Sequence, residues 1–483
     1  FHREFCVVKI TVHVLSFCFW FSLFLRGGFI MIKELSISGF RGFGQAQTVK
    51  FSIPDQESVG SGLTIITGAN NAGKTTIIES IRAFNGTDSP SFSEGRRNNL
   101  TGGKVTLTLT DEESKTYSIV SVEGGGSSTQ KNEDFNLQFY VLPSRRAIPF
   151  DFGKGVWNRE TYISYSQTLE AQRSSSLGNF ESRIFQIEDK KAEFDAVLSK
   201  VLGNDFRWVV EQRDSGQYYI KYSKGDISHS GEGVGDGIWS IFTICASLFD
   251  APEKSVVVID EPELSVHPAL QKRLMALFLE YSKTHQIILC THSPYFINWA
   301  AIVNGANLTR IVQEGSVSKC YSISDECRRS FRGILRDLNN PHTLGIEANE
   351  AFFLEDSIIL VEGQEDVVIF NKMARDLNIG LKGNFFGWGV GGAPKMKAFL
   401  MLFKDLGYKK VVAVLDGDKA DDAEDLRTAF PEYKIITLIE DDIRDKRARE
   451  IHEKSGITDE KGNYKEEHKE YIIGLINEIN SVL

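Results

Sequence analysis

Apolar and polar positions in residues 31–350 follow two different periods. Runs in which apolar residues occur at every second position, or without a break, predict β-strands, and longer runs with apolar residues three or four positions apart predict helices. The predicted strands lie within residues 32–40, 47–53, 62–68, 104–123 (a hairpin), 137–150, 255–263 and 285–294. Helices are predicted at residues 74–84 and 267–283. Residues 156–212 are polar and helix-prone around a serine-rich interruption, which predicts an inserted helical subdomain.

From residue 351 onward the pattern is a regular alternation, β-α-β-α-β-α-β-α. Its four strands lie within residues 357–363, 384–390, 409–418 and 434–441. Such alternation predicts a parallel, Rossmann-like α/β sheet. Because 483 residues exceed one ordinary hydrophobic core, we expect two α/β domains, at residues 31–350 and 351–483.

The first 30 residues do not fit this two-domain pattern. They are apolar enough to suggest a membrane segment, although Lys9 and His13 interrupt the run. The chain begins with Phe1, and Met31 opens a sequence that is typical of a natural start. We therefore expect residues 1–30 to be upstream-translated or non-native sequence, with a membrane anchor or signal segment as the alternative. No later stretch approaches a membrane span, so no membrane partner is expected.

Charge and cysteine usage narrow the class of protein. The formal net charge is −10, so the chain has no overall attraction for nucleic acid, and any such contact needs a local basic groove or bridging metal ions. The six cysteines occur singly, without a CxxC pair or a zinc-like spacing. A reduced, cytoplasmic protein is the simplest interpretation.

The stretch GANNAGKT, residues 68–75, fits the pattern G-x-x-x-x-G-K-[ST] between a predicted strand and a predicted helix. In that context backbone N–H groups and the helix N-terminus surround nucleotide phosphates, Lys74 reaches the β- and γ-phosphate oxygens, and the Thr75 hydroxyl ligates Mg²⁺. We expect ATP as the ligand. The predicted nucleotide-binding residues of this loop are Gly68, Asn70, Asn71, Gly73, Lys74, Thr75 and Thr76.

Two further buried strands end in residues that suit nucleotide hydrolysis. SVVVIDEPE supplies Asp260 for the magnesium shell and Glu261 to polarise the attacking water. Four apolar residues precede the aspartate, so the two carboxylates emerge only at the end of the strand. CTHSP places His292 at the end of another strand, where it would sense the γ-phosphate; the alternative is that His292 only caps a loop.

This order of motifs resembles the ABC-type ATPase heads of the SMC, RecF and recombination-repair class, over roughly residues 31–330. ISGFRGF with Arg41, ELSVHP, and the glycine-rich HSGEGVGDGI carry the resemblance together with the phosphate loop. The glycine-rich segment stands where such heads carry a signature motif that completes the nucleotide site of a second subunit. Its register is ambiguous, because either Ser230–Gly233 or Gly235–Gly237 could supply the contacting turn. The resemblance implies ATP bound between two heads, and hence at least a homodimer.

Acidic residues gather after the apolar strands of the C-terminal part. Glu362 ends the first strand, and Asp366 lies four residues later, where a helix begins. Asp416 and Asp418 end the third strand. Because parallel strands bring such residues to one edge of a sheet, these carboxylates would repel one another unless divalent cations bind there. We therefore expect Mg²⁺ or Mn²⁺ at this edge, the alternative being solvated acids with Asp-Gly-Asp as a tight turn.

Three other stretches of this part allow two interpretations each. LIEDDIRD adds Glu440 and the two aspartates after it; one of these acids, with Glu440 as our candidate, would serve a second metal, and a solvated turn is an equal alternative. Residues 387–395, GWGVGGAPK, either bring Lys395 to a scissile phosphate or form a plain connection. The mixed-charge run 444–470 predicts an exposed face.

Glu-Gly after the first strand and Asp-x-Asp after the third resemble the Toprim domain of topoisomerases, bacterial primases and OLD-family nucleases. The resemblance implies that Glu362 acts as acid/base or metal ligand and that Asp416 and Asp418 hold the metal. An ABC-type head followed by a Toprim domain resembles the layout of OLD-family (overcoming lysogenization defect) ATP-dependent endonucleases, whose relatives include anti-phage effectors. This implies ATP-gated, two-metal cleavage of DNA, with a partner protein of a defence system as a candidate. The insert 156–212 departs from the longer dimerisation region of larger relatives.

Two rival functions come from the same residues. One is an ATP-gated scaffold whose Toprim domain binds a partner or nucleic acid without cutting; intact Glu362, Asp416 and Asp418 argue against it. The other is primase- or topoisomerase-like chemistry, for which the chain lacks zinc-binding cysteines and a nucleophilic tyrosine context.

Overall fold

The computed structural model describes most of the chain after residue 29. The described residues are 30–84, 92, 94–122, 129–133, 139–144, 155, 157–162, 180–230, 233–334, 344–353, 356–447 and 453–483. The expectation for residues 1–30 therefore falls outside the described residues except at Ile30, and so does most of 156–179. Within the described ranges, no helix is long and apolar enough to cross a membrane.

The N-terminal domain, up to Ile334, is built on a six-stranded sheet in the order β14-β13-β3-β12-β11-β7. Its strands are β3 (Leu63–Gly68), β7 (Phe139–Leu142), β11 (Val256–Asp260), β12 (Gln286–Cys290), β13 (Asn307–Glu314) and β14 (Val317–Ser322). All are parallel except β14, which pairs antiparallel with β13. The apolar strands expected around the phosphate loop and the two later motifs are thus confirmed.

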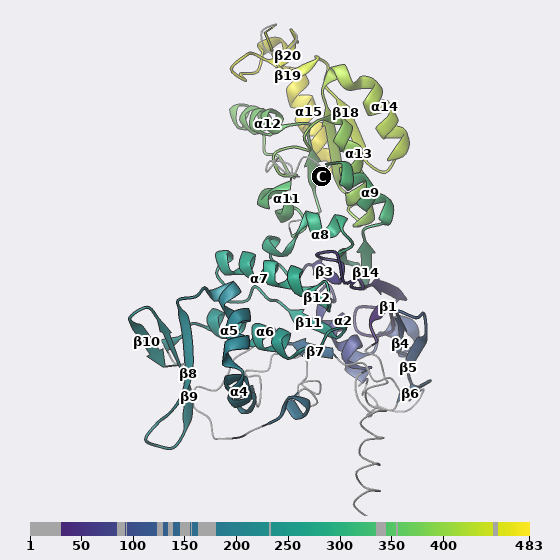
Figure 1. Cartoon of the computed structure of the whole chain (residues 1–483). Coiled ribbons are helices and arrows are strands. Elements are labelled where there is room, and N and C mark those ends of the chain that lie inside the picture. The colour runs from purple at the N-terminus through teal and green to yellow at the C-terminus, as the bar shows by residue number, and fades with distance from the viewer. Residues whose placement is uncertain are drawn as a thin grey trace, which may run out of the picture.

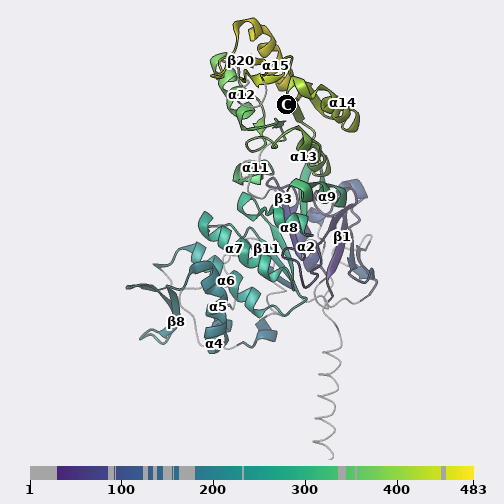
Figure 2. The same ribbon diagram turned by 45° about the horizontal axis from the view of Figure 1, so that its top comes forward.

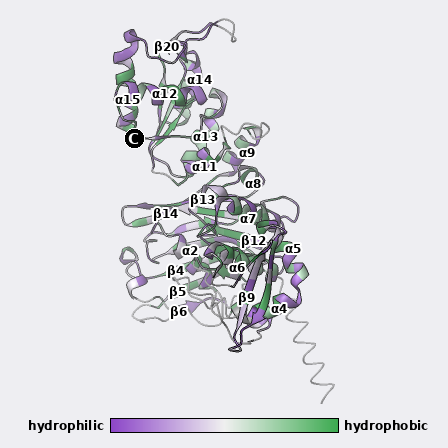
Figure 3. Ribbon diagram, turned by 90° about the vertical axis from the view of Figure 1, so that its left-hand side faces the viewer, coloured by the Kyte–Doolittle hydropathy of each residue, from purple (hydrophilic) through white to green (hydrophobic). Residues whose placement is uncertain are grey.

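Both faces of this sheet are covered, which explains why its strands are almost continuously apolar. Helix α2 (Lys74–Arg82) packs on the face that carries Ile66. Helices α6 (Asp236–Asp250) and α7 (Pro268–Tyr281) pack on the opposite face, which carries Ile65. In Figure 3 the strands between these layers are mostly hydrophobic. The polar residues that follow each strand therefore leave the core together at one edge.

A second, antiparallel sheet packs against the same face as α2. Its order is β2 (Gln47–Lys50), β1 (Ile32–Ser38), β4 (Thr106–Asp111), β5 (Thr116–Ser121) and β6 (Thr129–Lys131). The pairing of β4 with β5 confirms the hairpin predicted within residues 104–123.

The insert is helical only in part. Helices α4 (Phe180–Asp189) and α5 (Lys191–Leu202) confirm the helix-prone character of its described middle. Residues 206–212, however, form a strand, β8 (Phe206–Gln212), which pairs with β9 (Tyr218–Lys224), and β9 pairs with β10 (Ile227–Ser230). The prediction of a purely helical subdomain to residue 212 is wrong, because the side chain of Trp208 turns inward and is buried against Phe194 and Phe242.

The C-terminal domain, from Asp356 onward, has a four-stranded parallel sheet in the order β16-β15-β17-β18. Its strands are β15 (Ile358–Leu360), β16 (Asn384–Phe385), β17 (Val411–Leu415) and β18 (Lys434–Thr437). Its helices are α12 (Gln364–Asp376), α13 (Ala393–Asp405), α14 (Ala420–Ala429) and α15 (Lys469–Val482). Helices α13 and α14 cover one face and α12 and α15 the other. The predicted alternation is confirmed.

Two features of this region were not expected. A short parallel pair, β19 (Asp442–Arg444) and β20 (Gly456–Thr458), follows β18. In addition, α8 (Trp299–Val303), α9 (Asp325–Ile334) and α11 (Ile346–Glu350) lie where the two domains meet (Figures 1 and 2). Their apolar residues belong to the same buried core as α6, α7 and α13. The two sheets are therefore joined by packed helices.

Candidate functional site

The phosphate loop has the geometry that its sequence predicts. β3 ends at Gly68, α2 begins at Lys74, and Gly68 and Gly73 have φ angles of 147° and 124°, which favour glycine. The Lys74 ammonium donates hydrogen bonds to the carbonyl oxygens of Gly68 (2.9 Å) and Ala69 (3.1 Å). Burial lowers the pKa of Lys74. The ammonium thus lies across the loop at the place where phosphate oxygens would be bound.

A cavity of about 920 Å³ opens beside this loop. Most of the predicted nucleotide and head-magnesium residues line it: Arg41, Asn70, Asn71, Gly73, Lys74, Thr75, Thr76, Asp260, Glu261 and His292. Gly68 is not a lining residue and contributes its carbonyl to Lys74 instead. Ser230 and Gly235 are also absent from the described lining of the cavity. Residues from six separated segments therefore meet around one space large enough for a nucleotide.

The His292 segment beside the cavity is held by Glu263, a carboxylate for which the sequence predicted no role. Glu263 accepts hydrogen bonds from the Thr291 hydroxyl (2.8 Å) and from the His292 backbone N–H (2.6 Å). Burial raises the pKa of Glu263 and lowers that of His292, where Lys74 adds to the effect. His292 is thus kept neutral, able to accept as well as donate a hydrogen bond. Glu261 adopts a φ of 46° and donates its backbone N–H to the Cys290 carbonyl at 2.8 Å.

Arg41 reaches the cavity from the loop after β1, where Glu79 of α2 holds it. The shortest distance between the guanidinium and the Glu79 carboxylate is 2.8 Å. The Asn98 side chain fixes the loop by donating to the Arg41 carbonyl oxygen at 2.6 Å. Sequence reasoning missed Glu79, because a glutamate on a helix surface carries no signal of its own.

The signature candidates lie at the end of the insert. Ser230 ends β10, and Gly235 precedes α6 in an extended conformation. A Cβ atom placed at Gly235 would meet no described atom within 4 Å. Among the described residues, none therefore fills the space in front of this turn.

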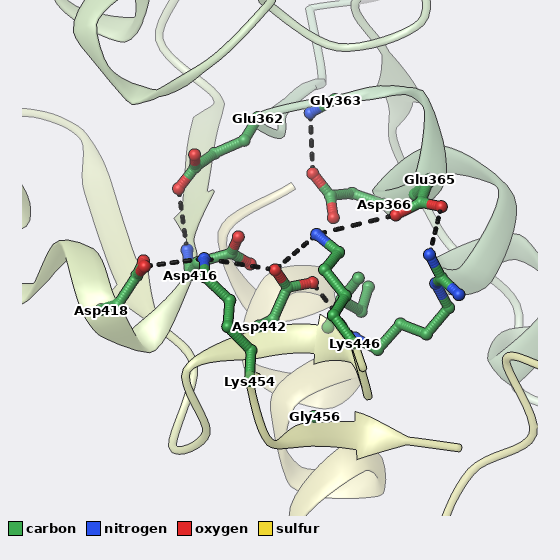
Figure 4. Close-up of polar contacts among 12 residues, drawn as sticks. Glu362, Gly363, Glu365, Asp366, Asp416, Asp418, Asp442, Lys446, Lys454 and Gly456 are labelled. Carbon is green, nitrogen blue, oxygen red and sulfur yellow. Dashed lines mark hydrogen bonds and ion pairs between the residues drawn. The ribbon is translucent and has the colours of Figure 1, made fainter. Parts of the chain in front are cut away.

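In the C-terminal domain, Glu362 directly follows Val361, just past the end of β15, and accepts hydrogen bonds from four backbone N–H groups, of which Figure 4 shows that of Asp416. Its carboxylate accepts from the backbone N–H groups of Asp416 (3.0 Å) and Ala393 (3.3 Å). Its carbonyl accepts from Gly391 and Gly392 at 2.9 and 2.8 Å. Burial raises the pKa of Glu362. The loop 387–392 is thus a cradle for this residue, and Lys395 lies in the first turn of α13.

Beside Glu362, Asp366 is buried and Asp416 is half-buried. Asp366 accepts the Gly363 N–H at 2.7 Å. Burial, reinforced by Glu362 and Asp442, raises the pKa of Asp366 to about 7. Burial raises the pKa of Asp416 to about 8, and Asp366, Asp442 and Glu362 add to the effect. The two predicted acids are therefore electrostatically coupled to each other and to neighbouring carboxylates.

The two aspartates of the Asp-Gly-Asp turn differ sharply. Asp418 pairs with Lys454 at 2.7 Å and with Lys419 at 3.3 Å. Burial works against ionisation, but the hydrogen bond and charge of Lys454 prevail and lower the pKa of Asp418. One acid of the turn is thus ionised and paired with lysine, while the other is poised to hold a proton at neutral pH.

The acid that residues 440–442 add to this edge is Asp442, not Glu440. Asp442 is 1% exposed and accepts contacts from the ammonium groups of Lys446 (2.6 Å) and Lys454 (3.4 Å). The Glu440 carboxylate instead contacts the Ser455 hydroxyl and the His468 imidazole. Of the three acids 440–442, Asp442 and not our candidate Glu440 thus lies at this edge, because β19 turns the Asp442 side chain inward.

The mixed-charge run 444–470 is more than an exposed face. Ile457 and Thr458 of β20 are fully buried, and Lys446 and Lys454 place their ammonium groups among the carboxylates (Figure 4). Although burial opposes protonation, contact with Asp442 raises the pKa of Lys446, and contact with Asp418 raises that of Lys454. These two lysines are the functional candidates that sequence reasoning missed, since one lysine in a charged run resembles another.

The described carboxylates suit a divalent cation chemically, but they are not arranged so that three of them could bind the same ion. Carboxylate oxygens are preferred ligands of Mg²⁺ and Mn²⁺, and the raised pKa values of Asp366 and Asp416 show that negative charge there lacks compensation. Within the described part of the chain, however, no three His, Cys, Asp or Glu side chains are placed so that they could hold one ion. The expected convergence of Glu362, Asp366, Asp416 and Asp418 is not formed, because backbone amides and lysines hold the carboxylates one by one.

Two family models match the chain. One, described as an AAA domain, putative AbiEii toxin, Type IV TA system, matches residues 63–298. The other, described as an overcoming lysogenization defect protein-like TOPRIM domain, matches residues 353–418. The first includes the cavity walls from the phosphate loop to His292, and the second includes Glu362 and the Asp-Gly-Asp turn.

Three curated relatives are similar to parts of the chain. The OLD nuclease of Thermus scotoductus is 28% identical over 44% of this chain and 42% of its own length. The Septu protein PtuA of Bacillus thuringiensis is 22% identical over 56% of this chain and 74% of its own length. Endonuclease GajA of Bacillus cereus is 24% identical over 36% of this chain and 28% of its own length. The chain thus spans less than half the length of the two relatives named as nucleases.

Among solved structures, SMC heads match with low scores. A SmcHead bound to the C-winged helix domain of ScpA has a TM-score of 0.41 and 17% identity, covering 61% of this chain and 98% of that structure. The SMC head domain from Thermotoga maritima has a TM-score of 0.36 and 16% identity, covering 61% and 99%. From the two family models and the three relatives, the chain is an AAA-type ATPase domain joined to an OLD-like TOPRIM domain, homologous to OLD nuclease, PtuA and GajA.

Proposed function

We propose that the protein is an ATP-binding, metal-dependent nuclease that cuts DNA at the acids of its C-terminal domain, under the control of nucleotide in its N-terminal domain. The observation that carries the proposal is the gathering of four acids around one sheet edge, within or next to the OLD-like TOPRIM match. Asp366 and Asp442 are buried there, and Glu362 and Asp416 are half-buried. When bound there, divalent ions would supply stabilisation of the attacking and leaving oxygens of an in-line displacement.

Each residue of this edge has a role that follows from its contacts. Two backbone N–H groups donate hydrogen bonds to the Glu362 carboxylate, so this carboxylate is held in one orientation before substrate binds. Asp366 and Asp416, with pKa values raised by burial to about 7 and about 8, suit metal ligation or proton transfer near neutral pH. Lys454 lowers the pKa of Asp418, and Lys446 forms an ion pair with Asp442, so bound substrate or metal would have to replace these lysine contacts.

In the N-terminal domain the cavity supports ATP binding and hydrolysis. Lys74 and the loop amides would bind phosphate oxygens, and Thr75 and Asp260 would hold Mg²⁺. Glu261 would orient the attacking water, with neutral His292 facing the γ-phosphate. Lys74→Ala should abolish ATP turnover, and unchanged turnover would contradict this assignment.

A plasmid-nicking assay in Mg²⁺ or Mn²⁺ tests the nuclease. We expect Glu362→Gln and Asp416→Asn to lower the nicking rate by about 100-fold or more, because each removes an oriented or metal-binding carboxylate. Glu440→Gln is the matched control and should cut like the wild type, since its carboxylate pairs with Ser455 and His468. Equal cutting by wild type, Glu362→Gln and Asp416→Asn would disprove the assignment.

A non-cutting scaffold is the second candidate, and one observation favours it. The acids as arranged in the described residues do not offer three ligands to one ion, and two of them are already neutralised by lysines. A scaffold would bind DNA in a gel-shift assay with Mg²⁺ and show no cleavage product, whereas a nuclease would show both.

For the cellular setting we propose a cytoplasmic homodimer or higher homo-oligomer that acts on DNA in anti-phage defence, with a partner protein of the defence system. Support comes from the OLD-like TOPRIM domain and from relatives named OLD nuclease, endonuclease GajA and Septu protein PtuA. Protection of a bacterial host against phage plating by the wild type, and its loss in Asp416→Asn, would test the role.

A further inference from the structure

One helix connects the proposed nuclease acid with the N-terminal domain. α13 begins at Ala393, whose N–H donates to the Glu362 carboxylate at 3.3 Å. The two residues before it, Gly391 and Gly392, donate to the Glu362 carbonyl at 2.9 and 2.8 Å. Three of the four groups that hold Glu362 therefore move with the start of α13.

The other end of α13 is fixed to the N-terminal domain. Asp405, its last residue, accepts hydrogen bonds from the Ser324 backbone N–H (2.8 Å) and hydroxyl (2.6 Å). The carbonyl of Leu406 accepts from the guanidinium of Arg310 at 3.3 Å. Arg310 is 8% exposed, and its guanidinium lies 3.7 Å from the centre of the Tyr408 ring. The Arg310 contact is buried and the two Ser324 contacts are partly buried, and all three are directional, so this end of the helix has one defined position.

Arg310 stands on β13, which pairs with β3, the strand that leads into the phosphate loop. In the β13–β3 pairing, Arg310 is opposite Thr67 and Ile311 is opposite Gly68, where the phosphate loop begins. On the adjoining β14, Ser318 lines the nucleotide cavity and donates its N–H to the Gly42 carbonyl at 2.7 Å. A shift of the β13–β14 hairpin with nucleotide would thus reach Arg310 directly.

The body of α13 is suited to carry such a shift. It has 13 residues and one proline, at the second position, where a helix tolerates it, so it is a rod about 20 Å long. The ring of Phe399 packs on Phe331 of α9, and the ring of Phe403 packs on Tyr408. Figures 1 and 2 show α13 directly beside α9. Because packed cores resist gradual deformation, the helix would move as a unit.

We propose that α13 couples nucleotide in the N-terminal domain to the position of Glu362, with Asp405 and Arg310 as positioning residues. The consequence of this coupling rests on the proposed function: ATP would control whether Glu362 is positioned for DNA cleavage. The coupling itself is a property of the fold and can be measured without cleavage.

Hydrogen exchange of the full chain, followed by mass spectrometry, tests the coupling. The exchange rate of the amides of residues 389–393 is measured in Mg²⁺ alone and in Mg²⁺ with ATPγS, and the two rates are compared. We expect ATPγS to change this rate by about threefold or more in the wild type. Asp405→Ala and Arg310→Met should abolish the change while still binding ATPγS, as shown by protection of the phosphate loop.

Two further variants keep the test decisive. Asp376→Ala is the matched control, because Asp376 is likewise the last residue of its helix, α12, and pairs with its neighbour Arg375; it should respond like the wild type. If Asp405→Ala fails to fold, Ser324→Ala tests the same contact. It removes only the hydroxyl donor and should weaken the response to ATPγS. A wild type without a nucleotide response, or a response retained in Asp405→Ala and Ser324→Ala, would overturn the inference. Nicking without a response would refute the coupling alone, and a response without nicking would refute the nuclease alone.

Discussion

At the scale of single residues, the C-terminal site is governed by which carboxylates have a partner cation. Lys446 and Lys454 pair with Asp442 and Asp418, whereas Asp366 and Asp416 have raised pKa values because burial leaves their charge uncompensated. The sequence predicted Glu362 and the aspartates because uninterrupted apolar runs precede them. It did not predict the lysines, since their position depends on the pairing of β19 with β20, which brings residues 444–447 and 453–458 beside the acids.

The Lys446–Asp442 contact should be visible in the stability of the protein. Removing one partner of a buried ion pair costs about 3–5 kcal/mol, but Lys454 still lies 3.4 Å from Asp442, so for Lys446→Met we expect a loss of about 2 kcal/mol. Lys469→Met, which removes an exposed pair with Glu466, should cost no more than about 0.5 kcal/mol. Urea unfolding in EDTA at pH 7 measures both; equal losses would mean that the buried contact adds nothing.

The raised pKa values of Asp366 and Asp416 predict how stability depends on pH. In the unfolded chain both would lose their protons near pH 4, whereas in the folded chain they do so at about pH 7 and about pH 8. The folded state therefore binds more protons between these limits, and the metal-free protein should become less stable as pH rises from 5 to 9.

Thermal unfolding in EDTA checks this slope, and Asp416→Asn should flatten it. Mg²⁺ should raise the melting temperature more at pH 8.5 than at pH 6, because the ion must displace protons at the lower pH. Asp459→Asn serves as the control, since hydrogen bonds from Asn463 lower the pKa of Asp459 and it does not titrate in this range. A melting temperature that rises with pH would show that these acids are not buried as described.

At the scale of elements, the sequence located the strands better than it located their ends. β15 and β18 are shorter than their apolar runs, because Val361 and Leu438 remain buried beyond the paired residues. The β8–β9 hairpin carried a readable signal, with Phe206, Trp208 and Val210 at alternate positions, but its polar surroundings favoured helix. β19 and β20 are three residues each and pair across a long connection, which no local pattern reveals.

The loop before α13 gives a prediction at this scale. Gly389 has a φ of 90°, and a Cβ atom there would lie 2.7 Å from the Gly363 backbone. We therefore expect Gly389→Ala to lower the free energy of unfolding by about 2 kcal/mol or more and to weaken Mg²⁺ binding. Gly380→Ala is the control, since a Cβ there meets no described atom within 4 Å, and it should change stability by less than about 1 kcal/mol. Calorimetry measures the stability of both variants. A Gly389→Ala variant as stable as Gly380→Ala would show that the loop tolerates a side chain at residue 389.

At the scale of the whole molecule, the two domains share one core. The Trp299 ring stacks on Phe331 at 5.3 Å, and Phe331 contacts Phe399 of α13 at 5.1 Å, so apolar contacts run from one domain into the other. The sequence placed a boundary near residue 350 from a loosened pattern, but it gave no sign of this contact. Aromatic residues on separate short helices are brought together only by the assembled fold.

The proposed homodimer predicts that nucleotide hydrolysis belongs to a pair of chains, with the turn at Gly235, which lies outside the described cavity lining of its own chain, acting on the partner's site. Gly235→Arg should therefore fold normally yet lose ATP turnover, as should Lys74→Ala. In an equal mixture, random pairing makes half the dimers mixed, each with one intact composite site, so turnover should recover to roughly a quarter of the wild-type rate. If the two variants stay inactive when mixed, although the wild type elutes as a dimer with ATP, the complete site lies within one chain.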